Sequence, residues 1–105
     1  SREAGAKAQA VQALRALPED QQSYLVAWLL ADLGATQEAF RIASRLVPLS
    51  APPSIFWHPS MRSTLDDPGF PALATQLGLM KYWKATRTKP DACTDKSPPA
   101  FCSMI

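Results

Sequence analysis

Residues 22–33, Gln-Ser-Tyr-Leu-Val-Ala-Trp-Leu-Leu-Ala-Asp-Leu, are followed, just after Gly34, by residues 37–46, Gln-Glu-Ala-Phe-Arg-Ile-Ala-Ser-Arg-Leu. Neither run contains an internal Pro or Gly, and each is long for a strand, so the pattern predicts two helices. Gly34 favours the left-handed conformation that ends many helices, and Thr36 is placed to cap the second helix. Because the connection is so short, we expect an antiparallel helical hairpin over residues 20–46.

The alanine-rich segment at residues 3–17 predicts a further helix before the hairpin. Its small side chains favour close approach to a neighbouring helix; the expected apolar stripe is Ala6, Ala10, Ala13, Leu14 and Leu17. Pro18 then suits the first turn of the next helix, where a missing N–H is tolerated. Glu19 and Asp20 are expected near the positive end of that helix dipole.

The second half of the chain contains shorter helical patterns between prolines. The three prolines of residues 48–54 predict an extended connection, followed by an apolar anchor at 55–57 and one or two turns at 58–65. Asp67 is expected to cap a short helix that ends at Gly78, with the apolar stripe Phe70, Leu73, Ala74 and Leu77. A last helix is expected near residues 80–86, and the polar, proline-containing tail after it is expected to be irregular and partly disordered.

Length and composition describe a folded domain and argue against several classes of partner. The 105 residues can form one compact domain, and the apolar fraction of 47% and charged fraction of 19% are those of a globular protein. A net charge of +2 gives no electrostatic argument for nucleic acid, and no apolar run approaches the roughly 20 residues of a membrane span. The chain opens in helical composition without a signal segment, so we expect it to be the C-terminal piece of a longer or processed protein.

The hairpin resembles a tetratricopeptide repeat, in which small residues let two helices approach around a glycine bend. The residues that carry the resemblance are Ala27, Leu30, Gly34, Ala39 and Leu46. The first helix resembles the second helix of a preceding repeat, because Gly5, Ala10, Val11 and Leu17 align with Gly34, Ala39, Phe40 and Leu46. The offset of 34 − 5 = 29 residues is shorter than the usual period of about 34, so an irregular array is implied.

Residues 55–93 are similar to a C-terminal ending found on bacterial proteins that carry tetratricopeptide arrays. The matching segments are Phe56-Trp57-His58-Pro59-Ser60-Met61-Arg62, Asp67-Pro68-Gly69-Phe70, Leu77-Gly78-Leu79, Tyr82-Trp83 and Pro90-Asp91-Ala92-Cys93. In those proteins an N-terminal winged-helix DNA-binding domain or nucleotide cyclase precedes the array, often across one membrane helix. The resemblance implies an all-α chain with a repeat-like part at 1–50, a non-catalytic cap at 55–93 and an irregular tail at 94–105.

The tetratricopeptide resemblance also implies a binding groove on the first helix of the hairpin. Carried over residue by residue, its lining is Gln21, Tyr24, Trp28, Ala31 and Asp32. Two aromatic rings among polar groups suit peptide recognition. The competing interpretation is that the first helix or Phe56-Trp57 covers Tyr24 and Trp28, because large aromatic side chains usually pack.

Polar residues give weaker indications of chemistry. His58 is the only histidine, and no nucleophile motif accompanies it, although Ser60 and the acidic pair Asp66 and Asp67 are near in sequence. A structural role for His58 and capping by Asp67 explain these residues without a metal, so no metal or cofactor is expected.

Two further clusters each allow two interpretations. The basic residues Lys81, Lys84, Arg87 and Lys89 lie beside Tyr82 and Trp83, which is a pattern of nucleic-acid binding or, more simply, of a solvated helix face. Cys93 and Cys102 either form a disulfide in an oxidising compartment or remain free thiols in the cytosol. The resemblance slightly favours the periplasm over the cytoplasm.

The sequence therefore predicts a non-catalytic interaction or regulatory domain, part of a larger bacterial signalling or transcription-regulating protein. Its expected partner is a protein or peptide segment, including a second copy of itself, with neither nucleic-acid binding nor membrane insertion. Two alternatives remain open at this stage. One is a purely structural cap of a helical array. The other is a ligand sensor or enzyme that uses His58 with a nearby carboxylate.

Overall fold

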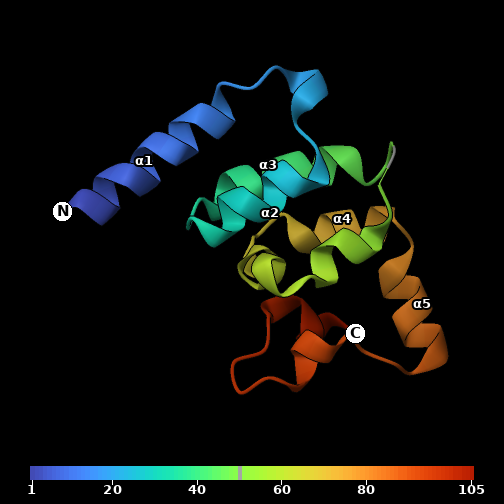
Figure 1. Cartoon of the computed structure of the whole chain (residues 1–105). Coiled ribbons are helices and arrows are strands. Elements are labelled where there is room, and N and C mark those ends of the chain that lie inside the picture. Colours follow the sequence, from blue (N-terminus) through green and yellow to red (C-terminus); the bar gives the residue numbers. More distant parts are fainter. Residues whose placement is uncertain (50) are drawn as a thin grey trace. The chain divides into compact units, whose positions relative to one another are not determined.

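The computed structural model describes residues 1–49 and 51–105, and this part of the chain is helical with no strand (Figure 1). The prediction of an all-α protein is therefore confirmed. The chain divides into two compact units, Ser1–Thr64 and Leu65–Ile105. Residues 94–105 belong to the second unit, and the segment 55–64 belongs to the first.

Helix α1 spans Arg2–Arg15 and is stabilised mainly by local interactions. The Ser1 hydroxyl accepts a hydrogen bond from the Ala4 N–H at 3.2 Å, and Glu3 and Arg15 have the charges that the two helix ends favour. None of its side chains is buried. The expected stripe is therefore at most partly covered, although α1 does contact α2; alanine propensity forms the helix without requiring a fully buried face.

Helices α2 (Tyr24–Asp32) and α3 (Thr36–Leu46) pack directly against each other and form the core of the first unit. Their contact contains the fully buried side chains Ala27, Leu30, Ala39, Ile42 and Ala43. Three alanines in that list allow the backbones to approach closely, while Leu30 and Ile42 fill the remaining space. Gly34 joins the helices with φ +86°, the left-handed conformation that its sequence position predicts.

The entry to α2 differs from the sequence prediction. Residues Glu19–Gln21 form a separate 3₁₀ turn, and α2 begins only at Tyr24. Gln22 explains the break, because its buried side chain donates to the Leu17 carbonyl at 3.1 Å and accepts from Arg45 at 3.1 Å. Arg45 also pairs with Glu19 at 3.1 Å, so this turn is attached to α3 instead of continuing as helix.

The residue at the start of α3 is also not the expected one. Ala35 occupies the N-cap position, and Thr36 is the first helical residue. The Thr36 hydroxyl lies 3.2 Å from the Ser63 hydroxyl, so it contacts another segment and does not cap its own helix.

Two 3₁₀ segments, Pro53–Trp57 and Pro59–Asp66, follow α3. Ile55 and Phe56 are buried, and the ring of Phe56 lies 6.0 Å from that of Phe40 on α3. The apolar anchor expected at residues 55–57 thus folds onto the helix pair through its first two residues. Trp57 is 40% exposed, so it does not share this burial.

The second unit is built on α4 (Phe70–Gln76) and α5 (Leu79–Thr86). Gly78 separates them with φ +77°, where a glycine is favoured. Gly69 is the N-cap of α4, because the expected cap Asp67 accepts a hydrogen bond from Gly69 N–H at 2.8 Å in the preceding turn. Of the two neighbouring aromatic residues of α5, Trp83 is buried and Tyr82 is 58% exposed.

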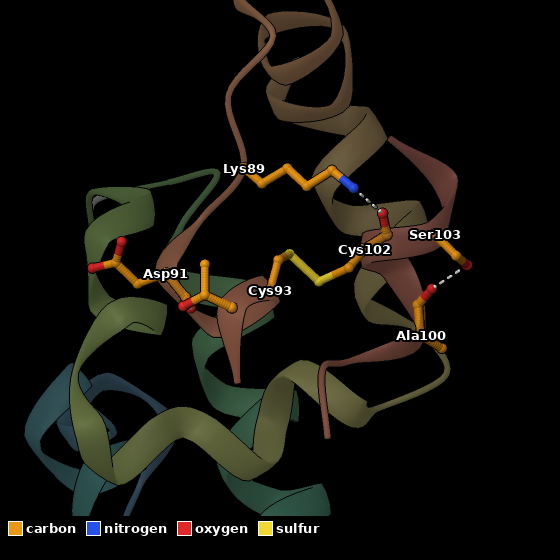
Figure 2. Close-up of a disulfide and its surroundings, with 7 residues drawn as sticks. Lys89, Asp91, Cys93, Ala100, Cys102 and Ser103 are labelled. Atoms are coloured by element: carbon orange, nitrogen blue, oxygen red, sulfur yellow. Dashed lines mark hydrogen bonds between the residues drawn. A yellow bond between two sulfur atoms is a disulfide. The ribbon is translucent and has the colours of Figure 1, made fainter. Parts of the chain in front are cut away.

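The C-terminal tail is folded, which corrects the expectation of partial disorder. It forms the 3₁₀ turns Asp91–Thr94 and Ala100–Met104, joined by a Cys93–Cys102 disulfide (Figure 2). Lys89 Nζ donates to the Cys102 carbonyl at 3.3 Å, as Figure 2 shows. Phe101 is buried, with ring centroids 4.9 Å from Phe70 and 5.6 Å from Trp83. The disulfide therefore holds a residue of the core in place.

Candidate functional site: an aromatic cleft in the first unit

A cleft of about 510 Å³ opens on the first unit where α2 faces the segment Pro52–His58. Four of its lining side chains are rings of Tyr24, Trp28, Trp57 and His58, and the others are Pro52, Ser54 and Ile55. No Asp, Glu, Lys or Arg is among these described lining residues. The cleft thus offers ring faces and a few uncharged polar groups to a ligand.

Trp28 forms a wall of the cleft and is fixed on several sides. Its indole N–H donates to the Ile55 carbonyl at 3.1 Å, which connects α2 to the segment that follows α3. The Tyr24 ring meets it edge-on, with centroids 5.0 Å apart and planes at 72°. The His58 ring stacks on it, with centroids 3.9 Å apart and planes at 18°. A side chain held in this way keeps one rotamer, so this wall is formed before any ligand arrives.

The position of His58 is set by Trp28 and by the turn that His58 begins. Its Nδ1 accepts a hydrogen bond from the Ser60 N–H at 3.1 Å. In the neutral ring the proton therefore lies on Nε2, which becomes a donor. His58 contributes a flat face and one donor to the cleft.

Tyr24 and Trp57 differ from Trp28 because large parts of their rings reach solvent. Tyr24 is 43% exposed, against 40% for Trp57, whereas Trp28 is half-buried. Exposed aromatic rings beside a pre-formed wall are a typical composition of protein recognition surfaces.

The structure places the sequence-predicted groove residues in different environments. Tyr24 and Trp28 both line the cleft. Ala31 is buried, while Gln21 and Asp32 are exposed and are not among the lining residues. The break before Tyr24 explains the place of Gln21, because this residue lies in the preceding turn and not on the α2 helix.

Sequence reasoning did not assign the second wall of the cleft, which consists of Pro52, Ser54, Ile55, Trp57 and His58. The available signal is the apolar pair Phe56-Trp57, which the competing interpretation of the sequence places over Tyr24 and Trp28 as one of two possible covers. Within this segment Ile55 and Phe56 are buried, whereas Trp57 is 40% exposed and lines the cleft with His58. The residue types alone do not distinguish buried Phe56 from exposed Trp57.

The basic cluster of α5 has a different composition from a base-stacking surface. Trp83 is 6% exposed and packs on Phe101, so of the two aromatic residues only Tyr82 presents its ring to solvent. Lys81 and Lys84 line a second depression, of about 650 Å³, together with Thr75, Met80, Ala85 and Met104. This arrangement is that of a solvated helix face with methionine between lysine stems.

The structure shows no metal-binding cluster of three or more His, Cys, Asp or Glu within the part of the chain that it describes. Likewise, none of the described helices combines the length and apolarity needed to cross a membrane.

Comparisons with known proteins give no further information about this site. No model of a known protein family matches the chain, and searches of curated proteins and of solved structures find no match either.

Proposed function

We propose that the chain is a non-catalytic interaction domain that binds a segment of a partner protein in the aromatic cleft. The observation that carries the proposal is the pair of exposed rings, Tyr24 and Trp57, beside the fixed wall of Trp28. Large rings that are rigid and solvent-exposed supply contact area at a low cost in conformational entropy, which is why they dominate binding energy at interfaces.

The α2–α3 pair supports an extension of this proposal. Its close packing on alanines around Gly34 agrees with a tetratricopeptide-like hairpin, in which the first helix carries the binding residues. In such a domain the bound segment regulates a larger signalling or transcription-regulating protein. The environment of His58 also favours recognition over catalysis, since its ring is stacked on Trp28 and its Nδ1 is engaged by backbone.

A peptide-library array probed with the full chain tests the proposal, with matched variants on the same helix. Tyr24→Ala removes a ring of the cleft, and binding of the selected peptides is expected to weaken by about tenfold or more, as for an interface hot spot. Leu29→Ala is the control, because Leu29 is an exposed α2 residue of similar size that does not line the cleft.

Equal affinities for the Leu29→Ala variant and the unmodified chain are expected. The proposal is overturned if Tyr24→Ala leaves all selected peptides bound as before, or if Leu29→Ala alone abolishes their binding. Circular dichroism of both variants shows that neither loss comes from unfolding.

A further inference from the structure

We infer that the cleft is selective for an uncharged, extended, proline-rich segment. This inference rests on the proposed function and names the class of ligand. It starts from the charge of the site: none of the described lining residues is an Asp, Glu, Lys or Arg. A ligand that carries a charge into this cleft loses hydration without gaining an ion pair, so charge complementarity favours an uncharged segment.

The hydrogen-bonding groups of the cleft favour a ligand that presents carbonyls. Apart from the indole N–H groups of Trp28 and Trp57, three lining side-chain groups can donate: the Tyr24 hydroxyl, the Ser54 hydroxyl and Nε2–H of His58. Among the described residues none of these three groups has a hydrogen-bond partner. The indole N–H of Trp28 is already used by Ile55.

A proline-rich segment fits this donor set better than other peptides do. Proline has a backbone carbonyl but no N–H, so a run of prolines brings acceptors without bringing donors that need partners. In the polyproline II conformation these carbonyls make no internal hydrogen bonds and remain available. A segment in an α-helix or a strand uses its carbonyls within its own secondary structure.

The ring faces favour the same ligand. The compact, apolar pyrrolidine ring packs on exposed aromatic faces, as in other aromatic-lined grooves that bind proline-rich segments. The edge-on contact of Tyr24 with Trp28 forms an angled surface on which such a ring can lie. Because polyproline II is already ordered in the free peptide, little conformational entropy is lost on binding.

The main competing ligand is a quaternary ammonium group, since aromatic rings also attract cations. A carboxylate commonly assists such binding, and no carboxylate lines the cleft among the residues described. Tetramethylammonium therefore serves as a second probe in the same experiment.

The test titrates the full chain with a synthetic oligoproline peptide blocked at both ends, followed by calorimetry. Binding is expected at a dissociation constant of roughly 1 mM or below. Tyr24→Phe removes only the hydroxyl donor and is expected to weaken binding about three- to tenfold, as for one lost hydrogen bond. Tyr24→Ala is expected to weaken it further. Tyr82→Ala, a change at an exposed tyrosine of the second unit, is the control and leaves the affinity unchanged.

Other outcomes overturn the inference. A blocked Gly-Ser peptide of equal length that binds as tightly as the oligoproline removes the selectivity for proline, and tetramethylammonium binding without oligoproline binding assigns the cleft to a cation. If oligoproline fails while array-selected peptides bind in a Tyr24-dependent manner, the inference falls and the proposed function stands. If no peptide binds at all, both fall.

Discussion

Gly34 shows at the scale of one residue how the sequence determines the helix pair. Its φ of +86° is costly for any residue with a Cβ, yet no heavy atom lies within 4 Å of the position where a Cβ would be. The requirement for glycine is therefore conformational and not a matter of space. Gly5, near the N-terminus of α1, also has open space around it but needs no left-handed backbone.

These two glycines give a prediction with opposite signs. Gly34→Ala is expected to lower the free energy of unfolding by about 1 kcal/mol, because alanine is strained at positive φ. Gly5→Ala is expected to stabilise α1 by up to about 1 kcal/mol, because alanine has a higher helix propensity than glycine. Urea unfolding followed by far-ultraviolet circular dichroism measures both. Changes of the same sign in the two variants would contradict the assignment of left-handed backbone to Gly34.

At the same scale, Arg45 and Gln22 explain why the start of α2 was mispredicted. The residue types before Tyr24 are compatible with a helix, and nothing in their order shows that Gln22 turns inward. Its two side-chain hydrogen bonds, to the Leu17 carbonyl and to Arg45, depend on α3 being packed nearby. Such tertiary contacts override local propensity, and they cannot be predicted from the sequence pattern alone.

Among the helices, α1 is stabilised least by packing. It has no buried side chain, and the ion pair of Arg15 with Glu38 at 3.1 Å joins two partly exposed groups. Exposed ion pairs contribute little, typically below about 1 kcal/mol. A helix of this length is only marginally stable without tertiary contacts, even when it is rich in alanine.

We therefore expect the amide protons of α1 to exchange with solvent much faster than those of α3, whose Ala39, Ile42 and Ala43 are fully buried. Hydrogen exchange followed by NMR gives protection for each residue. Protection factors in α1 that equal those of α3 would show that α1 is packed against something in solution.

The cleft shows at this scale what the order of residues could and could not predict. The α2 wall was predictable, because Tyr24 and Trp28 are four positions apart and so share a helix face. The opposite wall comes from a short 3₁₀ segment next to prolines, in which apolar residues do not repeat at a regular spacing. The directions of its side chains depend on the burial of Ile55 and Phe56 in the core. Half of the candidate site was therefore accessible to sequence reasoning.

For the molecule as a whole, the disulfide is the covalent constraint of the second unit. Cys93 and Cys102 are 9 positions apart, and Phe101 beside the bridge packs against both Phe70 and Trp83. A bridge over so short a loop is expected to stabilise the unit by about 2–3 kcal/mol, chiefly by restricting the unfolded chain. The sequence left open whether these cysteines are paired, because residue spacing alone does not determine their geometry.

The Cys93→Ala/Cys102→Ala variant is expected to lose that stability, so the second unit unfolds at a lower urea concentration. Trp83, buried against Phe101, is the reporter through its indole N–H signal in NMR spectra. Ser103→Ala, which removes an exposed hydroxyl bonded to the Ala100 carbonyl, is a neighbouring control with little expected effect. Unchanged unfolding of the double variant would mean that the bridge does not stabilise the native unit.

The three tryptophans also allow the most direct test of the interaction cleft. Their indole N–H signals are followed in a two-dimensional NMR titration of the full chain with a peptide selected on the array. Trp28 and Trp57 line the cleft, whereas Trp83 is buried in the second unit. The account predicts that the Trp28 and Trp57 signals shift in a saturable manner while the Trp83 signal stays in place. A peptide that binds and moves only the Trp83 signal, or none of the three, would contradict the cleft as the binding site.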